Sequence, residues 1–191
     1  MPKTIRTYDV LLQTVLDQFG RKGAPFLIGI AGPPATGKST LAERLVGDLN
    51  AAGEQACFCP MDGFHLTNVQ LDSLGLRPAK GRIDTFDADA FVAAVQRLAA
   101  RTSLWWPVYS RQRHDPIPEG TRISGTEGVY VVEGNYVLSK TEPWRAAGDA
   151  FNLSIFVDTP DEVLRQRLML RHQRSGRSQS EALEKIDRTD M

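Results

Sequence analysis

The chain has 191 residues, of which 41% are hydrophobic and 24% are charged, and these proportions are ordinary for a globular protein. Lysines plus arginines number 23, as do aspartates plus glutamates. The resulting net charge of zero gives no whole-chain electrostatic reason to expect a nucleic acid or a membrane as a partner, although a local basic site stays open. The length suits one domain with a sizeable core, and we expect residues 1–191 to form it.

Features that the sequence lacks predict the compartment. The first residues contain no apolar segment of the kind found in secretory signals, and no stretch is long and apolar enough to span a bilayer. Cys57 and Cys59 are the only cysteines and are too few for a zinc site, so we interpret them as buried, reduced thiols. Together these features predict a cytoplasmic protein.

The first predicted elements are a helix and a strand. Apolar residues recur at helical spacing between residues 4 and 22, which predicts a packing helix over residues 4–22 that ends near Gly20 and Gly23. The apolar run 25–31 then predicts a buried strand, and a helical pattern begins again at residue 41.

Between this strand and the next helix lies a glycine-rich loop, residues 32–39. It fits the pattern Gly-x-x-x-x-Gly-Lys-[Ser/Thr], in which backbone N–H groups and a helix N-terminus bind phosphate groups. In this pattern Lys38 reaches the outer phosphates and the Ser39 hydroxyl is a ligand of Mg²⁺. A chance glycine turn is the alternative, and the flanking strand and helix argue against it. The residues expected to bind the nucleotide are Gly32, Pro33, Pro34, Ala35, Thr36, Gly37, Lys38, Ser39 and Thr40.

Acidic residues follow two further predicted strands. A short strand over residues 55–61 ends at Asp62, and a buried strand over residues 128–133 ends in Glu133. Because open α/β sheets hold ligand groups at the carboxyl ends of their strands, both acids are candidate catalytic residues. Glu133 has the position of an acid that holds or orients the Mg²⁺ shell, directly or through water, so Ser39 and Glu133 are the candidate metal residues. An ordinary Asp-Gly turn is the alternative for Asp62.

Two polar segments are candidates for binding a second substrate. The segment 63–86 is long and rich in turn residues, and a helix follows it with Asp87 as its N-cap. The aromatic run 104–109 leads into a proline-punctuated loop over residues 110–118. Solvated charged loops are the alternative for both segments. The side chains expected to contact this substrate are His65, Lys80, Arg82, Tyr109, Arg111 and His114, with Trp105 and Trp106 as core residues or apolar pocket walls.

The C-terminal part is predicted to contain a strand over residues 153–158 and two helices. The first helix carries a row of arginines on one face with few acids nearby in sequence. A solvated face is the alternative. We favour a mobile anion clamp, or lid, over about residues 165–180, followed by a helical stretch over residues 180–188. The arginines of the row are Arg167, Arg171 and Arg174.

Several motifs, in this order, resemble those of the phosphoribulokinase, uridine kinase and bacterial pantothenate kinase family. The resemblance covers about residues 25–190, and the stretch Met61–His65 is similar to a bacterial branch of pantothenate-kinase-like, sugar (fructose) transport-associated kinases. The matching motifs are the glycine-rich loop, the turn at Asp62-Gly-Phe, the segment 107–118, the strand end at Glu133-Gly-Asn-Tyr and the segment Arg167–Arg177.

The resemblance implies an α/β fold of the P-loop NTPase type, a three-layer sandwich with a parallel core sheet and a helical lid. It implies a kinase that uses ATP and Mg²⁺ to phosphorylate a hydroxyl of a small metabolite, such as a sugar, a nucleoside or a pantothenate-like compound. Asp62 then corresponds to the base that accepts the proton of the acceptor hydroxyl, with Glu133 as the competing candidate. Lys38, Arg171 and Arg174 would stabilise charge on the transferring phosphoryl group.

Two departures from the family and two alternatives stay open. The acceptor-recognition residues of the pantothenate and uridine kinases cannot be matched one by one to this sequence, so the substrate stays open. No apolar run remains after the lid for the further core strand of the family, so either the chain is cut short or its sheet is one strand smaller. A nucleotide-hydrolysing switch is the alternative function, and the absence of a guanine-reading Asn-Lys-x-Asp motif argues against it. The oligomeric state is open, with a homodimer as one arrangement.

Overall fold

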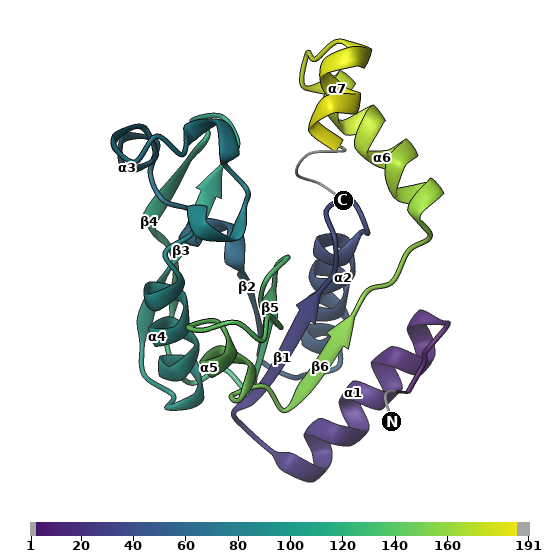
Figure 1. The fold of residues 1–191 in the computed structure, drawn as a ribbon. Coiled ribbons are helices and arrows are strands. Elements are labelled where there is room, and N and C mark those ends of the chain that lie inside the picture. The colour runs from purple at the N-terminus through teal and green to yellow at the C-terminus, as the bar shows by residue number, and fades with distance from the viewer. Residues whose placement is uncertain (1–2, 187–191) are drawn as a thin grey trace.

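The computed structural model describes residues 3–186, and Figure 1 shows helices packed around a central sheet. Short 3-10 turns lie at Met61–Phe64, Arg77–Ala79 and Ile83–Thr85. The strands are β1 (Phe26–Ala31), β2 (Ala56–Pro60), β3 (Leu104–Ser110), β4 (Asp115–Ile123), β5 (Val129–Glu133) and β6 (Leu153–Phe156). The helices are α1 (Tyr8–Lys22), α2 (Lys38–Ala51), α3 (Asn68–Ser73), α4 (Ala88–Ala99), α5 (Arg145–Gly148), α6 (Asp161–Arg174) and α7 (Gln179–Lys185).

The central sheet is parallel, with its strands in the order β2-β5-β1-β6. Because β5 lies between β2 and β1, Glu133 at its end is opposite Pro60 on one side and Ile30 on the other. The segments that follow these three strands therefore leave the sheet at one edge, which is where α/β sheets bind ligands. The predicted α/β fold with a parallel core sheet is confirmed.

Helices cover both faces of this sheet, as the sequence predicted. Alternate residues of β1 point to opposite faces, so Phe26 and Ile28 pack in a cluster with α1 and α2, while Leu27 packs in a cluster with α4 and α5. Every residue of β1 and β5 is buried, as in other parallel strands with helices on both sides. The result is the three-layer arrangement visible in Figure 1.

The prediction that residues 110–118 form a loop was wrong in part. β3 and β4 form an antiparallel hairpin, in which Tyr109 lies opposite Pro116. The prolines of this segment indicated a loop, but both strands of a two-stranded ribbon are edge strands, where a missing N–H need not cost a ladder bond. The hairpin also separates the two tryptophans, since Trp106 is fully buried whereas Trp105 is 45% exposed.

The remaining elements agree with the sequence apart from their ends. α1 begins at Tyr8, four residues after the predicted start, and Asp87 is the N-cap of α4 as predicted. The long segment 63–86 contains α3, which is held at its start by a capping box. Of the last predicted helix, α7 covers Gln179–Lys185, and residues 187–188 lie outside the described residues. In the part of the chain that the structure describes, no helix has the length and apolar character needed to cross a membrane.

The turn that carries Asp62 packs tightly against the hairpin. A Cβ atom added at Gly63 would lie 2.0 Å from the carbonyl oxygen of Pro107 and 2.8 Å from the nitrogen of Val108. Both are backbone atoms, so no side chain can move aside to relieve the overlap. The indole N–H of Trp106 donates a hydrogen bond to the Pro60 carbonyl oxygen at 2.9 Å, next to this contact. The hairpin therefore fixes the position of the turn.

Gly63→Ala is expected to lower the free energy of unfolding by about 1–3 kcal/mol, the usual cost of overpacking a closed site. Urea unfolding measures the change. Gly20→Ala is the matched control because an added Cβ meets nothing within 4 Å there, and alanine favours the helix by up to about 1 kcal/mol. Equal midpoints for Gly63→Ala and the parent chain would contradict this seating of the hairpin on the turn.

Candidate functional site

The glycine-rich loop joins β1 to α2 at the carboxyl edge of the sheet. Its backbone is sharply curved, with positive φ angles of 64° at Ala35 and 92° at Gly37, the residue that caps α2. The Thr36 hydroxyl donates a hydrogen bond to the Pro33 carbonyl oxygen at 3.0 Å, and the Lys38 ammonium donates to the same oxygen at 3.3 Å. The curved backbone and the start of α2 form the kind of concave site, lined by N–H groups, that binds anions.

A buried ion pair lies beside this loop. Lys38 is 8% exposed and Glu133 is 5% exposed, and the Lys38 Nζ and Glu133 Oε1 atoms are 3.8 Å apart. Burial lowers the pKa of Lys38 and raises the pKa of Glu133, and in each case the partner's charge only partly opposes the effect. The Ser39 side chain also faces this carboxylate and helps to hold its pKa down. Neither charge is fully compensated, so an anion near the lysine or a cation near the carboxylate would stabilise the site.

Asp62 lies at the opening of the same site. It is exposed, and its charge raises the pKa values of Lys38, Glu133, His65 and Tyr109, which places it among these four groups. The structure thus brings both predicted acids to the glycine-rich loop, one buried and one facing solvent. The buried acid is the one beside Ser39.

Three of the predicted substrate residues form a cluster next to Asp62. The His65 and Tyr109 ring centroids are 4.9 Å apart, and the Lys80 ammonium lies 5.1 Å from the centre of the Tyr109 ring. The Lys80 Nζ donates hydrogen bonds to Asn68 Oδ1 at 2.7 Å and to the His114 carbonyl oxygen at 2.6 Å. Burial lowers the pKa of His65 and raises the pKa of Tyr109. We call this group, with Asp115, the acceptor-side cluster.

The other predicted substrate side chains point elsewhere or have partners of their own. Arg82 forms a bidentate ion pair with Asp84, with both N–O distances at 2.6 Å. Arg111 and His114 are exposed at the turn between β3 and β4. Their roles in binding stay predictions.

The sequence analysis did not select Asp115, which belongs to the acceptor-side cluster. Its Oδ1 atom accepts a hydrogen bond from the Asn68 N–H at 2.8 Å and lies 3.9 Å from the Lys80 Nζ. Asp115 is the first residue of β4 and lies opposite Ser110 in the hairpin. Its side chain was not predicted to belong to the site because a loop was expected where this strand begins.

The arginine row lies on α6, next to the glycine-rich loop. Arg167 donates hydrogen bonds from Nη1 to the carbonyl oxygens of Ala35 and Thr36 at 3.3 and 3.2 Å. The charge of Arg171 lowers the pKa of Lys38, so Arg171 also lies within electrostatic reach of the loop. Within residues 3–186, Arg174 forms no hydrogen bond or ion pair with the loop. Arg167, which the sequence analysis placed in the row but not among the catalytic residues, is the arginine that touches the loop.

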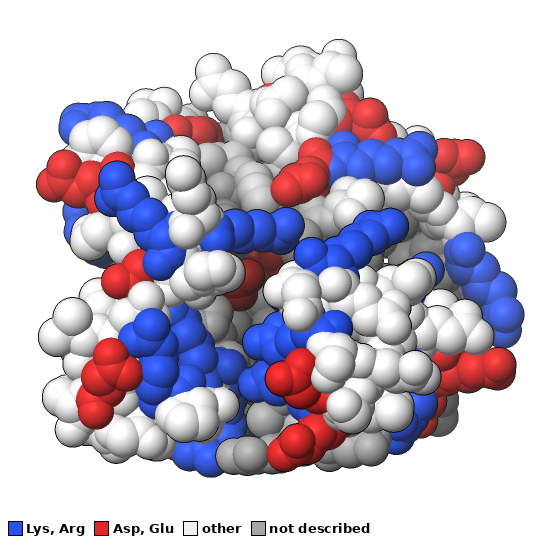
Figure 2. Space-filling view, turned by 90° about the horizontal axis from the view of Figure 1, so that it is seen from above, with Lys and Arg blue, Asp and Glu red and all other residues white. Residues whose placement is uncertain are grey.

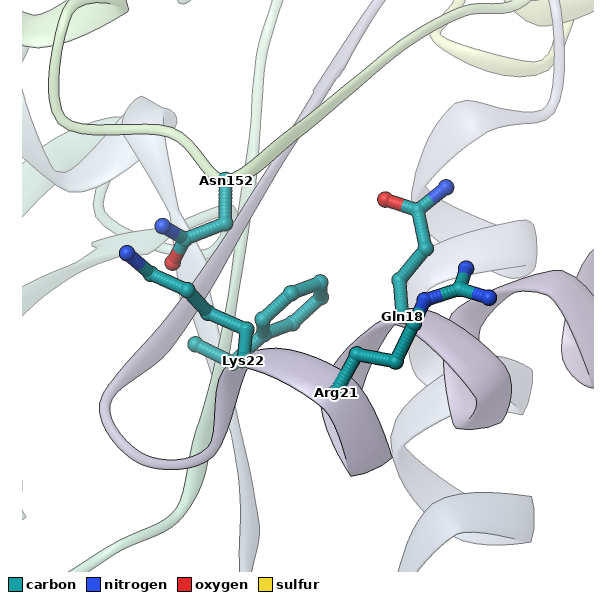
Figure 3. Close-up of a pocket in the computed structure, with 5 residues that line it drawn as sticks. Gln18, Arg21, Lys22 and Asn152 are labelled. Carbon is teal, nitrogen blue, oxygen red and sulfur yellow. The ribbon is translucent and has the colours of Figure 1, made fainter.

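Seen from above this edge, the surface is hollowed, and Lys and Arg side chains gather around the hollow (Figure 2). A different hollow of about 460 Å³ lies at the end of α1 (Figure 3). Phe26 and Asn152, at the amino ends of β1 and β6, line it together with Gln18, Arg21 and Lys22. This second hollow is therefore at the opposite edge of the sheet and contains none of the predicted site residues.

Metal ligands in this site can come only from a small set of oxygens. Among the described residues, no group of three or more His, Cys, Asp or Glu side chains is arranged to hold a metal ion. The Ser39 hydroxyl and the Glu133 carboxylate are hard oxygen ligands, and Mg²⁺ in phosphate sites typically uses one or two protein ligands beside phosphate oxygens and water. The residues present therefore fit Mg²⁺ bound together with a nucleotide.

A glycine-rich loop after the central strand of a parallel sheet, with acids at the neighbouring strand ends, defines the class of P-loop nucleotide-binding proteins. The model of the Phosphoribulokinase / Uridine kinase family matches residues 27–190. The chain belongs to this family of kinases.

Individual relatives agree with this assignment. The chain is 36% identical over 181 residues to the uncharacterized protein YggC of Escherichia coli (strain K12), covering 94% of this chain and 73% of that protein. It is 36% identical over 166 residues to the pantothenate kinase of Serratia proteamaculans (strain 568), covering 80% of this chain and 52% of that protein, so it spans about half of that relative. The crystal structure of a “putative fructose transport system kinase” from Silicibacter sp. TM1040 matches with a TM-score of 0.89 and 32% identity, covering 97% of this chain and 91% of that one.

The contact of Arg167 with the loop predicts how α6 responds to substitution. Arg167→Ala removes hydrogen bonds from a charged donor, each worth about 1.5–3 kcal/mol, so exchange of amide hydrogens in residues 35–37 and 165–175 is expected to be about tenfold faster or more. Hydrogen exchange with mass spectrometry measures it. Arg174→Ala, the matched control on the same helix, is expected to leave exchange of residues 35–37 unchanged. Equal exchange in both variants would mean that Arg167 does not hold the loop.

Proposed function

We propose that this protein transfers the γ-phosphoryl group of ATP to a hydroxyl of a small polar metabolite. One observation carries the proposal: the buried pair Lys38–Glu133 and the exposed Asp62 act on one another at the glycine-rich loop, and the acceptor-side cluster begins next to Asp62. Phosphoryl transfer needs a site for the donor next to a site for the acceptor, because its catalysis depends on positioning both on either side of the transferred group. ATP as donor and a small metabolite as acceptor are consistent with a cytoplasmic enzyme.

Lys38 and the loop residues 32–40 are proposed to bind the nucleotide phosphates. The Lys38 charge is buried and only loosely paired, since 3.8 Å is long for a direct hydrogen bond to Glu133. It is therefore placed to stabilise negative charge that develops on the transferring group. The nearby Arg171 would add to this effect, with Arg174 reaching the site only if α6 moves, as expected of a lid.

Asp62 is the better candidate for the base, and Glu133 for the metal shell. Asp62 is exposed and lies between the loop and the acceptor-side cluster, where a hydroxyl could reach its carboxylate. Glu133 is buried between neighbouring strands, beside Ser39. Bound Mg²⁺ would neutralise charge on the phosphate oxygens.

Removing the Lys38 charge is expected to lower the turnover number about a hundredfold to a thousandfold. Lys38→Met is preferred to alanine because it keeps the length of a side chain that is 8% exposed. Turnover is measured as ADP formed with and without an acceptor, because a kinase needs the acceptor whereas a switch hydrolyses ATP without one. Lys140→Met, at an exposed position, is the control and should behave as the parent chain. An unchanged turnover number in folded Lys38→Met would contradict the nucleotide role of the loop.

Substituting the two acids separates base from metal ligand. Asp62→Asn keeps the shape but removes the proton acceptor, so the turnover number should fall about a hundredfold or more while the Kd for ATP stays within about twofold. Glu133→Gln should instead weaken Mg²⁺-dependent ATP binding, measured by calorimetry with and without Mg²⁺. The reverse pattern, with ATP binding lost in Asp62→Asn and retained in Glu133→Gln, would exchange the two roles.

A further inference from the structure

The lysine and the two arginines of segment 63–86, on the acceptor side of the site, are already bound by acceptors from the chain itself. Lys80 Nζ has the Asn68 Oδ1, the His114 carbonyl oxygen and, at 3.9 Å, the Asp115 carboxylate around it. Because an ammonium group has three donors, this set leaves little capacity for another ligand. Lys80 therefore ties the start of α3 to the hairpin and acts as a positioning residue.

The arginines of the same segment are occupied in the same way. Arg77 donates to Asp72 Oδ2 at 2.9 Å and to the Asn68 carbonyl oxygen at 3.2 Å. Arg82 uses Nε and Nη2 on the two oxygens of Asp84. An acidic acceptor would have to displace one of these carboxylates to gain a cation, and the exchange of one carboxylate for another gives little net free energy.

The groups that do remain available suit hydroxyl groups. Among the described residues no donor reaches Asp115 Oδ2 and none of them hydrogen-bonds the Tyr109 hydroxyl, although both residues are only partly exposed. The carboxylate accepts a hydrogen bond from a hydroxyl, and the phenol can donate or accept one. The His65 and Tyr109 rings, tilted against each other with their centroids 4.9 Å apart, add apolar faces.

The electrostatic field of this cluster also opposes an acid. Burial is the main cause of the raised pKa of Tyr109; the charges of Asp115 and Asp62 raise it further, and the charge of Arg77 opposes them by less. Burial lowers the pKa of His65, which favours the neutral form of its ring. Arg111 and Arg113 are exposed at the hairpin turn, where a bound carboxylate would stay in water and gain little.

We propose that the acceptor is a neutral polyhydroxy compound, that is, a sugar, a sugar alcohol or a nucleoside, and that Asp115 and Tyr109 bind its hydroxyl groups. This inference rests on the proposed kinase function and narrows its acceptor. It excludes acceptors that carry a carboxylate next to the reacting part of the molecule. Asp115 is then a specificity-determining residue, since its charge favours hydroxyl donors and repels acids.

Pairs of compounds that differ mainly by a carboxylate test this directly: D-glucose and D-gluconate, uridine and orotidine, and pantothenol and pantothenate. ADP formation and product mass are measured for each with ATP and Mg²⁺. Every pair that supports transfer should show a kcat/KM at least about a hundredfold higher for its neutral member. A higher kcat/KM for an acidic member would overturn the neutral-acceptor inference and leave the kinase function standing. Transfer to no member, with ATP still bound, would overturn the proposed function and this inference with it.

Asp115→Asn tests the role of the charge at that position. It should raise the KM for the neutral acceptor about tenfold, leave kcat within about twofold, and shift the neutral-to-acid ratio of kcat/KM toward the acid. A purely structural role would lower activity with both members alike and leave that ratio unchanged, which would overturn the assignment of Asp115. Asp9→Asn removes an exposed carboxylate from α1 as the control and should leave the ratio as it is. Thermal unfolding of both variants checks that they are folded.

Discussion

The rest of the site depends on two buried charges, those of Lys38 and Glu133, at the carboxyl ends of the central strands. Lys38 and Glu133 are both almost fully buried, yet their charged atoms are 3.8 Å apart, so neither gains a short ion pair to offset the loss of water. Such a pair persists only on a rigid support. Here the support is β5, which is buried along its length and hydrogen-bonded to a strand on each side. The stability of the three-layer core therefore maintains a site that is electrostatically incomplete until an anion binds.

Around this pair the molecule separates two tasks. In Figure 1, α6 lies on one side of the molecule, where it contacts the glycine-rich loop, and the hairpin of β3 and β4 lies with α3 on the other. The two sides are joined through the sheet and through the turn at Met61–Phe64. This turn packs against the hairpin at Gly63, and Trp106 of the hairpin donates a hydrogen bond to the residue before the turn. The hairpin and α3 lie outside the central sheet, so their residues can change without disturbing the core of that sheet.

The parts of this structure that the sequence predicted are those set by local patterns. The alternation of buried strands, the glycine-rich loop and the acids at strand ends depend on residues close in sequence, and they appear at the predicted positions. The hairpin was missed because prolines break a ladder in most strands but are tolerated at edges. Trp105 and Trp106 are adjacent, and only the register of a strand decides which of them is buried.

The partners of the polar side chains could not be predicted in this way. Lys80 meets His114 and Asp115 across more than thirty positions, and Arg167 meets Ala35 and Thr36 across more than a hundred and thirty. The sequence of a polar loop does not show whether its lysine is free to bind a ligand or already donates hydrogen bonds to other residues of the chain. Only the folded arrangement shows that the cations of segment 63–86 are taken, and this changes the kind of acceptor that the site suits.

The contact of Arg167 with the loop carries a thermodynamic consequence. Arg167 of α6 donates hydrogen bonds to two carbonyl oxygens of the glycine-rich loop, and the same loop would surround a bound phosphate. The position of α6 and the binding of a nucleotide to the loop are therefore linked. Linkage is reciprocal: if bound nucleotide favours one position of α6 by some factor, then holding α6 in that position favours nucleotide by the same factor. A contact made to the outer surface of α6, far from any phosphate, would in this way tune the affinity of the protein for its donor.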